Sequence, residues 1–423
     1  MFRVALRRAA TKAPAQSRKE PILSSTPVLR TYAGNGPDAP QHERVGVARQ
    51  MIQYALGHAR SHRSGESFAQ AMLVLEQGLS NFRGGGDEEA MGMLTLAMST
   101  LHYERGQLRD AVEKLEMVRQ LRRTSLALKV AAWEALIGLE LQQGQDVRPS
   151  VLADEFSQLS RKSTEVSVPE LRAKAIKGLA DLVNGELQSA ELLFEGLRDY
   201  NVEEGQDQMG NIALSHGEFL HCTGNFASAN DFYERAHKIS EAKDKSSNLY
   251  LSSANMIPEE VLLGATCALG QLLSHLGKFQ EAEELLTKAL TKAENHFGST
   301  HPKVGIVLTC IALMFKHKAK MEASSSILIQ EGLYRRAIDL LKAPALDCED
   351  DEIQVDRGDI VALARGGYAE LLCIQQNRKD EGERMRKWAK TVWRNHRLSL
   401  AQALDFLEPP KAAVIDTRIG RVI

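Results

Sequence analysis

A five-position pattern recurs four times along the chain and constrains its fold more than any other feature. Each copy starts with a small residue. Glycine follows seven positions later, alanine twelve later, a large apolar residue sixteen later, and an apolar or small residue nineteen later. The copies start at Ser99, Gly178, Gly217 and Gly270. Fixed offsets of this kind predict one structural unit repeated in tandem.

Each position of the pattern has a physical role in a pair of helices. The first small residue lies inside one helix where a second helix must pass closely, and the glycine ends that helix in a left-handed conformation at little cost. The alanine belongs to the second helix at the crossing, and the large residue fills the space between this hairpin and the next. Only 5% of the residues are aromatic, and the abundant Ala, Leu, Glu, Gln and Lys favour helix over strand. The expected fold class is therefore all-α.

Two stretches, HGEFLHCTGNFASANDFYERA (216–236) and LGQLLSHLGKFQEAEELLTKA (269–289), resemble the tetratricopeptide repeat (TPR) family. Neighbouring units are longer than the basic repeat of about 34 residues, since Ala190 and Ala229 are 39 positions apart. Residues 298–302 form a Gly-x-x-His-Pro loop. These features resemble the kinesin-light-chain type of TPR. The resemblance implies a TPR helical-hairpin solenoid of about eight helix-turn-helix units over roughly 42–397.

Interruptions of the pattern indicate how the chain is divided. The expected parts are a cleaved targeting presequence (1–32), a linker (33–41), N-terminal TPR-like units (42–160), central and C-terminal TPR units (168–341) with an insertion near 241–260, an acidic linker (342–360), a terminal basic helical hairpin (361–397) and a tail of frayed or docked coil (408–423). The longest apolar runs are about a dozen residues, whereas spanning a bilayer takes ~20, so no transmembrane segment is expected.

The first 32 residues have the character of a mitochondrial presequence. They hold seven basic residues and one acidic residue, a charge of +7 − 1 = +6, with apolar residues at helical spacing. An Arg-rich, acid-poor amphipathic start is typical of this signal. Arg30, Tyr32 and Ala33 resemble its processing site, so we expect cleavage between Tyr32 and Ala33 and a location in the mitochondrial matrix. The alternatives are a basic tail that is never removed and a plastid signal.

Removing that segment leaves an acidic body. The whole chain carries −2, so residues 33–423 carry −2 − 6 = −8, which disfavours binding to phosphate backbones. The basic stretch 378–397 could contact RNA or anionic lipid, but the acidic run DCEDDE (347–352) offers it an intramolecular partner. Nucleic acid is therefore not the expected partner. The alternative is an organellar helical-repeat protein associated with RNA or a ribosome.

No motif points to catalysis, a cofactor or a metal. FRGGGDEEA (82–90) lacks the Lys-Ser/Thr of a phosphate loop, and neither GxSxG nor HExxH occurs. His58 and His62 have metal-ligand spacing on a helix but no third ligand, and the five cysteines contain no CxxC pair. We expect no enzymatic activity, no cofactor and no metal site. An enzyme with an unrecognised site is the distant alternative.

The TPR resemblance implies a partner-binding groove, because the first helices of such solenoids line an extended concave face. We expect Glu218 and Lys316 to offer exposed charges of opposite sign there. The full set of expected groove residues is Asn211, Glu218, His221, Gln271, His275, Lys316 and His317. A generic solvated helix face is the alternative.

One known subclass of the family binds the C-terminal carboxylate of chaperones through a Lys/Asn clamp. The position that its asparagine requires is occupied here by Thr100, Leu179, Glu218, Gln271 and Leu313. Binding of chaperone carboxylates is therefore not expected. The function that we expect is a mitochondrial TPR scaffold or assembly factor that binds a protein partner through its concave face.

Overall fold

The computed structural model describes residues 41–160, 167–197, 209–241, 250–346, 355–405 and 412–423. The presequence with Arg30, Tyr32 and Ala33, and the acidic run 347–352, lie outside these ranges. The described helices pair into eight helix-turn-helix hairpins, which confirms the predicted all-α solenoid. They are α3(Gln41–His62) with α4(Gly65–Gly84), α5(Glu88–Glu104) with α6(Leu108–Gln120), α7(Leu126–Gln142) with α8(Val147–Ser160), α9(Val168–Val183) with α10(Leu187–Glu195), α11(Gly210–Cys222) with α12(Phe226–Glu241), α13(Pro258–His275) with α14(Phe279–Phe297), α15(Pro302–Met321) with α16(Ile327–Leu340), and α17(Gly358–Ile374) with α18(Lys379–Val392).

The repeat pattern is explained by contacts within each hairpin. The first small residue lies directly under the large residue sixteen positions later. A Cβ atom added to Gly217 would come within 2.7 Å of the Tyr233 ring, and one added to Gly270 within 2.6 Å of Leu286 Cγ. The large residue therefore packs where the two helices of its own hairpin cross. The glycines between the two helices have φ values of 74° to 82°, in the left-handed region, at Gly106, Gly185, Gly224 and Gly277.

Gly277→Ala measures the cost of that left-handed turn. No heavy atom lies within 4 Å of a Cβ at Gly277, so the methyl group fits, but the φ of 74° disfavours alanine. We expect the free energy of unfolding to fall by about 1–2 kcal/mol, measured by urea denaturation followed by circular dichroism. The control is Gly332→Ala inside α16, where the space is equally open. It should be neutral or stabilising by up to ~1 kcal/mol. Equal losses at the two sites would contradict the role given to the turn.

The first helices of the hairpins form a continuous inner layer. Each contacts the first helix of the next hairpin, from α3 to α17. A helix that lines an open groove should keep one face exposed, yet every residue of α11 is buried. The concave face is therefore covered by other parts of the chain.

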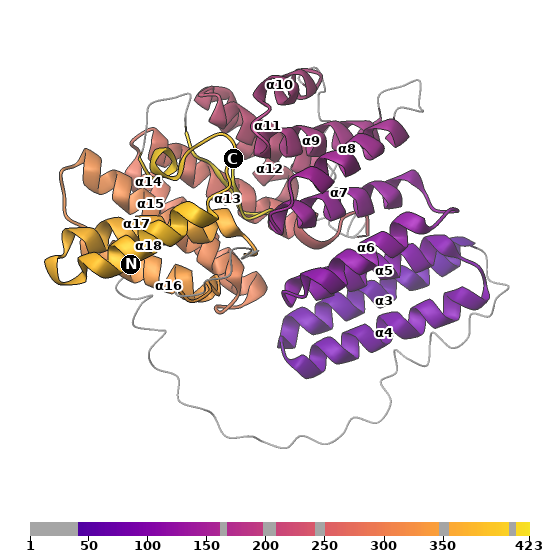
Figure 1. Cartoon of the computed structure of the whole chain (residues 1–423). Coiled ribbons are helices and arrows are strands. Elements are labelled where there is room, and N and C mark those ends of the chain that lie inside the picture. Colours follow the sequence, from indigo (N-terminus) through magenta and orange to yellow (C-terminus); the bar gives the residue numbers. More distant parts are fainter. Residues whose placement is uncertain (1–40, 161–166, 198–208, 242–249, 347–354, 406–411) are drawn as a thin grey trace.

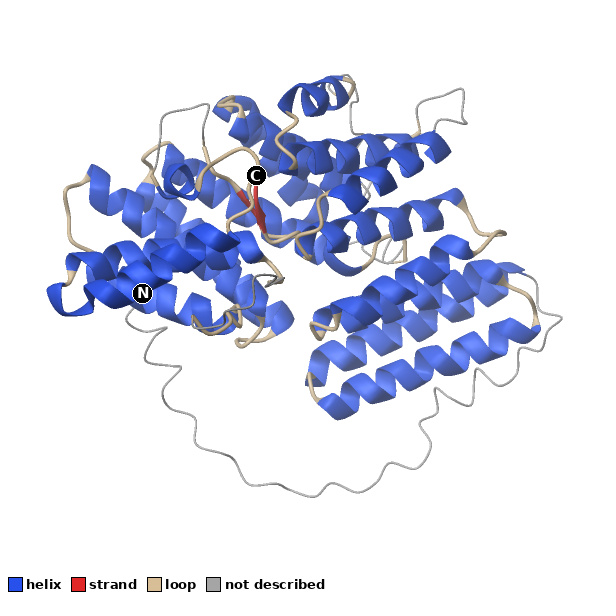
Figure 2. Cartoon of the chain, viewed as in Figure 1, coloured by secondary structure: helices blue, strands red, loops and turns tan. Residues whose placement is uncertain are grey.

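Two segments outside the hairpins provide that cover. Residues 250–257, which include the short helix η3(Ala254–Met256), pack against α5 and α7. Residues 412–423 contain the strands β1(Ile415–Asp416) and β2(Arg421–Val422) and pack against α13 and α17. Figure 1 shows the C-terminal segment passing between the two halves of the solenoid, and Figure 2 shows the two strands at the centre of the molecule. The expected tail is thus docked at residues 412–423, and α19(Leu400–Leu404) precedes it.

Candidate functional site

The segment 412–423 forms a small antiparallel hairpin inside the concave face. Ile415 pairs with Val422 and Asp416 with Arg421. Hydrogen bonds of 3.1 Å and 2.8 Å join the main chains of Val414 and Ile423. We call residues 412–423 the C-terminal hairpin, and the surface of α11, α13, α15 and α17 that holds it the groove.

The apolar side chains of the C-terminal hairpin enter two different hydrophobic cores. Val414, Ile419 and Ile423 belong to the core built from the helices α3 to α13. Ile415 and Val422 belong to the core of the C-terminal half, from α13 to α19. All five side chains are at most 2% exposed. The hairpin therefore joins the two halves of the solenoid through apolar contacts.

The groove recognises the main chain of the hairpin through side chains of the first helices. The amide of Gln271 on α13 makes two bonds to one residue: its Oε1 accepts from the Ile415 N–H at 2.8 Å, and its Nε2 donates to the Ile415 carbonyl at 3.0 Å. Lys303 on α15 donates to the carbonyls of Thr417 and Arg418, the latter at 2.8 Å. The Gln271 bonds require extended backbone at Ile415, and the Lys303 bonds go to carbonyls of the turn at residues 417–420. All of these bonds contact the main chain and do not depend on the identity of the bound side chains.

Arg418 is a fully buried cation of the C-terminal hairpin. Its guanidinium donates to Glu218 at 2.6 Å, to Asn211 Oδ1 at 2.9 Å and to Ser215 at 3.1 Å, all on α11, and to Asp416 at 2.9 Å. Burial raises the pKa of the Glu218 carboxyl well above its usual range, and the Arg418 guanidinium opposes that rise. The charge of Glu218 thus depends on the arginine that it binds.

Arg421, three residues later, binds a second group of carboxylates. Its Nε donates to Asp359 at the start of α17 at 2.6 Å, and its Nη1 donates to Asp146 at 3.0 Å and to the Leu141 carbonyl at 3.2 Å. Both Arg421 and Asp359 are buried. The groove therefore presents two carboxylate sites at a spacing that matches Arg418 and Arg421.

Residues 250–257 cover the other half of the concave face. Ser253 donates to the Leu96 carbonyl at 2.9 Å and shares a hydrogen bond of 3.1 Å with Thr100. Asn211 donates to the Met256 carbonyl at 2.9 Å, so one α11 side chain touches both covering segments. Asn255 donates to the Arg418 carbonyl at 3.3 Å, which links the segments directly.

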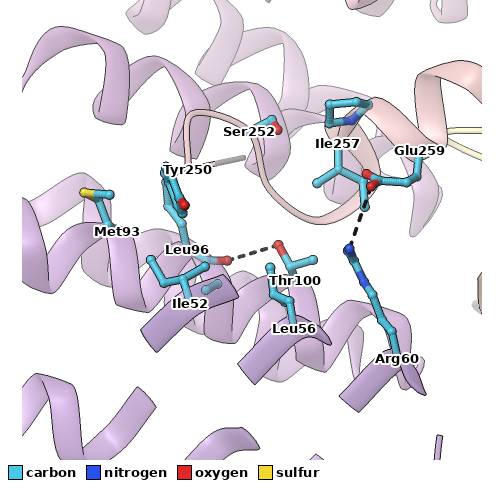
Figure 3. Close-up of a pocket in the computed structure, with 12 residues that line it drawn as sticks. Ile52, Leu56, Arg60, Met93, Leu96, Thr100, Tyr250, Ser252, Ile257 and Glu259 are labelled. Carbon is cyan, nitrogen blue, oxygen red and sulfur yellow. Dashed lines mark hydrogen bonds and ion pairs between the residues drawn. The ribbon is translucent and has the colours of Figure 1, made fainter. Parts of the chain in front are cut away.

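A small cavity remains where this segment meets the first two hairpins (Figure 3). It lies between Ile52 and Leu56 on α3, Leu96 on α5, and Tyr250, with Arg60 and Glu259 paired at its edge at 3.8 Å. Its volume of about 10 Å³ is of the order of one water molecule. The cavity is too small for an organic ligand.

The three predicted groove histidines form a row across the successive first helices α11, α13 and α15, which we call the histidine ladder. His221 Nε2 and His275 Nδ1 are 2.7 Å apart, and the Tyr233 hydroxyl lies 3.1 Å from His221 Nδ1. His317 Nδ1 lies 3.4 Å from Ser274 Oγ. Burial, with His317 nearby, lowers the pKa of His275 to about 4, and burial lowers the pKa of His221 well below its usual range. The folded protein thus favours neutral imidazoles here.

The ladder predicts a loss of stability in mild acid. An imidazole with a depressed pKa stabilises the fold above the unfolded pKa of about 6.5, and this contribution is lost as the pH falls toward about 4. We expect His275→Asn to reduce the drop in unfolding free energy between pH 7 and pH 4.5 by roughly 2–3 kcal/mol. Urea denaturation across this range measures the drop. The matched control is His62→Asn at an exposed site. If the unfolding free energies of wild type and His275→Asn fell in parallel with pH, the histidines would not be buried in the neutral form.

The structure places the seven predicted groove residues in three settings. Asn211, Glu218 and Gln271 contact the C-terminal hairpin, and the three histidines form the ladder. Lys316 instead donates to the Leu404 carbonyl at 2.8 Å and pairs with Glu370 at 2.5 Å. The expectation that Glu218 offers an exposed charge is wrong, because its side chain is 1% exposed and bound to Arg418. Binding of a partner by these seven residues stays a prediction.

Sequence reasoning missed the residues that fill the groove and several that hold them. Arg418 and Arg421 lie in the segment expected to be a frayed or docked tail, and Lys303 and Asp359 were not singled out. A signal was present: five of the twelve residues 412–423 are Ile or Val, which favour strand.

The predicted basic stretch lies on and after α18. Its exposed cations include Lys379, Arg384, Lys387, Lys390 and Arg394. Its expected acidic partner, 347–352, falls outside the described ranges, so the proposed pairing stays a prediction.

Nowhere in the described ranges do three or more His, Cys, Asp or Glu side chains gather so that they could hold a metal ion. None of the helices in those ranges combines the length and the apolarity needed to cross a bilayer.

Eight stacked helical hairpins in the described ranges define the chain as a helical-repeat protein, a class whose extended concave surfaces serve protein interaction. A family model described as "Tetratricopeptide repeat" matches residues 262–303, which comprise most of α13, all of α14 and the start of α15. The chain therefore carries a tetratricopeptide repeat, and the predicted resemblance is confirmed.

Comparison with solved structures finds a similarity to "Crystal structure of BtubC (BKLC) from P. vanneervenii". The TM-score is 0.41 and the sequence identity 15%, over 59% of this chain and 90% of that chain. The search of curated proteins gives no match.

Proposed function

We propose that the protein is a non-enzymatic scaffold or assembly factor of mitochondria that holds a segment of a protein partner in its concave groove. The observation that carries this proposal is the paired hydrogen bonding of Gln271 to the N–H and carbonyl of Ile415. A groove side chain that hydrogen-bonds to both the N–H and the carbonyl of one residue can bind an extended peptide of another protein in the same way.

Co-purification of the partner tests the groove as the binding surface. The groove variant combines Glu218→Ala, Gln271→Ala and Lys316→Ala. The control variant combines alanine substitutions of Glu234, Arg235 and Lys238, which are exposed on α12. Tagged proteins are compared after affinity capture from mitochondria, at equal amounts of folded protein. The groove variant should lose its partner and the control should keep it. The reverse result would move the binding surface to the outer helices.

The location rests on the first 32 residues, with their charge of +6. N-terminal sequencing of the protein from isolated mitochondria tests it. The mature chain should begin at Ala33, and Arg30→Ala should slow or shift the cleavage. Recovery of the protein outside mitochondria with Met1 intact would refute both the cleavage and the location.

A further inference from the structure

The C-terminal hairpin is held as a ligand is held, by side chains that converge on it from distant parts of the chain. Glu218 lies 200 residues before Arg418, and Gln271 lies 144 residues before Ile415. Within the hairpin, the main-chain bonds between strands come from Val414 and Ile423 and the β1–β2 pairing. The segment is therefore a compact piece that the groove surrounds on several sides.

The groove requires positive charge at two fixed points. Among the described residues, Arg418 is the cation paired with Glu218, and Arg421 is the cation paired with Asp359. Each of these two carboxylates is at most 3% exposed. Without a bound cation each carboxyl would either bear a buried, unpaired charge or have to take up a proton, and both are unfavourable. An occupant that replaces the C-terminal hairpin must therefore carry two cations at this spacing.

The shape of the groove adds two further requirements. The two hydrogen bonds between the Gln271 amide and the main chain of Ile415 require extended backbone at that residue. Lys303 requires two carbonyl acceptors at the positions of Thr417 and Arg418. The five buried Ile and Val side chains of the hairpin require aliphatic residues beside the arginines. Arginine suits the two charged positions because its planar fork binds carboxylates through several donors.

We propose that the C-terminal hairpin is a built-in copy of the partner's binding segment. The partner presents a short β-hairpin with aliphatic strands and two arginines three residues apart, one in the turn and one in the second strand. It displaces residues 412–423 from the groove. This inference rests on the proposed function, since it identifies the chemistry of the same groove's partner. The tethered hairpin competes at the effective concentration set by its attachment, so a partner must bind the groove more tightly than a free copy of the hairpin does.

Peptide exchange in the full-length protein tests the proposal. A site for a specific protease replaces residues 406–411, so that cleavage frees the hairpin without removing it. The probe is a fluorescein-labelled synthetic peptide of residues 411–423, and its binding is followed by fluorescence anisotropy. The cleaved protein should take up the peptide. The uncleaved protein should bind it at least about 10-fold more weakly, because the tethered hairpin competes.

Two control peptides test the stated chemistry. The double change R418A/R421A should weaken binding at least about 100-fold, because each loss leaves a buried carboxylate unpaired. A scrambled peptide of the same composition should not bind, since it loses the spacing. Equal binding of all three peptides would overturn the proposal. So would a cleaved protein that keeps its own hairpin against excess probe, or one that loses its helical circular dichroism when the hairpin leaves.

The same peptide separates this inference from the proposed function. Added in excess during co-purification, it should release the partner captured by the wild-type protein. A partner that stays bound contradicts the binding chemistry proposed here but leaves a scaffold that binds elsewhere. Failure to capture any partner contradicts the proposed function, whereas the exchange measurement on the purified protein still decides whether the groove accepts the peptide.

Discussion

We expect Arg418→Met to lower the free energy of unfolding by about 3–5 kcal/mol, because it removes one side of a buried ion pair. Glu218, whose side chain is 1% exposed, then either bears an unpaired charge or must take up a proton, and Asn211 and Ser215 lose a bonding partner. The free energy with which the C-terminal hairpin docks sets the upper limit of the loss, since the hairpin can leave the groove. Urea denaturation monitored by circular dichroism measures the effect.

Two further variants make this result specific. Arg109→Ala removes an arginine that is exposed on α6 and should change stability by no more than about 0.5 kcal/mol. Glu218→Gln combined with Arg418→Met replaces the unpaired carboxylate by a neutral amide and should recover part of the loss. A loss at Arg418 as small as that at Arg109 would mean that the arginine is not buried against α11.

Lys303→Met should lower the free energy of unfolding by a comparable ~3–5 kcal/mol. Lys303 binds both a buried glutamate of α13 and the C-terminal hairpin. The ammonium group and the Glu260 carboxyl are both 0% exposed and 3.0 Å apart. Tyr103 also donates to Glu260, and the hairpin carbonyls of Thr417 and Arg418 accept from Lys303. Removing the lysine leaves Glu260 buried without its cation.

The pH dependence of the Lys303 variant provides a second test. Burial raises the pKa of Glu260, and Lys303 opposes that rise, so the variant should raise the pKa further. A carboxyl whose folded pKa exceeds its unfolded value stabilises the fold at low pH, and that stability is lost as the pH rises through the folded pKa. The deficit of Lys303→Met should therefore grow between pH 5 and pH 8. Adding Glu260→Gln should remove this dependence. A deficit that shrinks with rising pH would contradict the buried pair.

The repeat units could be predicted because each is encoded by local spacing. Gly270, Gly277 and Leu286 lie within sixteen positions of one another. Gly270 packs against Leu286 within one hairpin, and Gly277 forms the left-handed turn between its two helices. Helix periodicity and turn glycines act over the same short range. For this reason the number and kind of units follow from a single sequence.

The filling of the concave face could not be predicted in the same way. The pairing of Arg418 with Glu218 joins residues 200 positions apart, and that of Arg421 with Asp359 joins residues 62 apart. No periodicity links such positions, and a buried Glu218 has the same local sequence as an exposed one. The groove residues were therefore placed on the correct helices, but their exposure and their partners depend on the docked segment.

Hydrogen exchange of the full-length protein, read by mass spectrometry, tests the central claim that residues 412–423 occupy the concave face. The N–H groups of Ile415, Arg418 and Ile423 are bonded to Gln271, Asp416 and Val414 respectively. We expect peptides covering these residues to exchange as slowly as those of α13, and Gln271→Ala to speed the exchange at Ile415. Exchange of the segment at the rate of an unfolded chain, unchanged by Gln271→Ala, would contradict a filled groove.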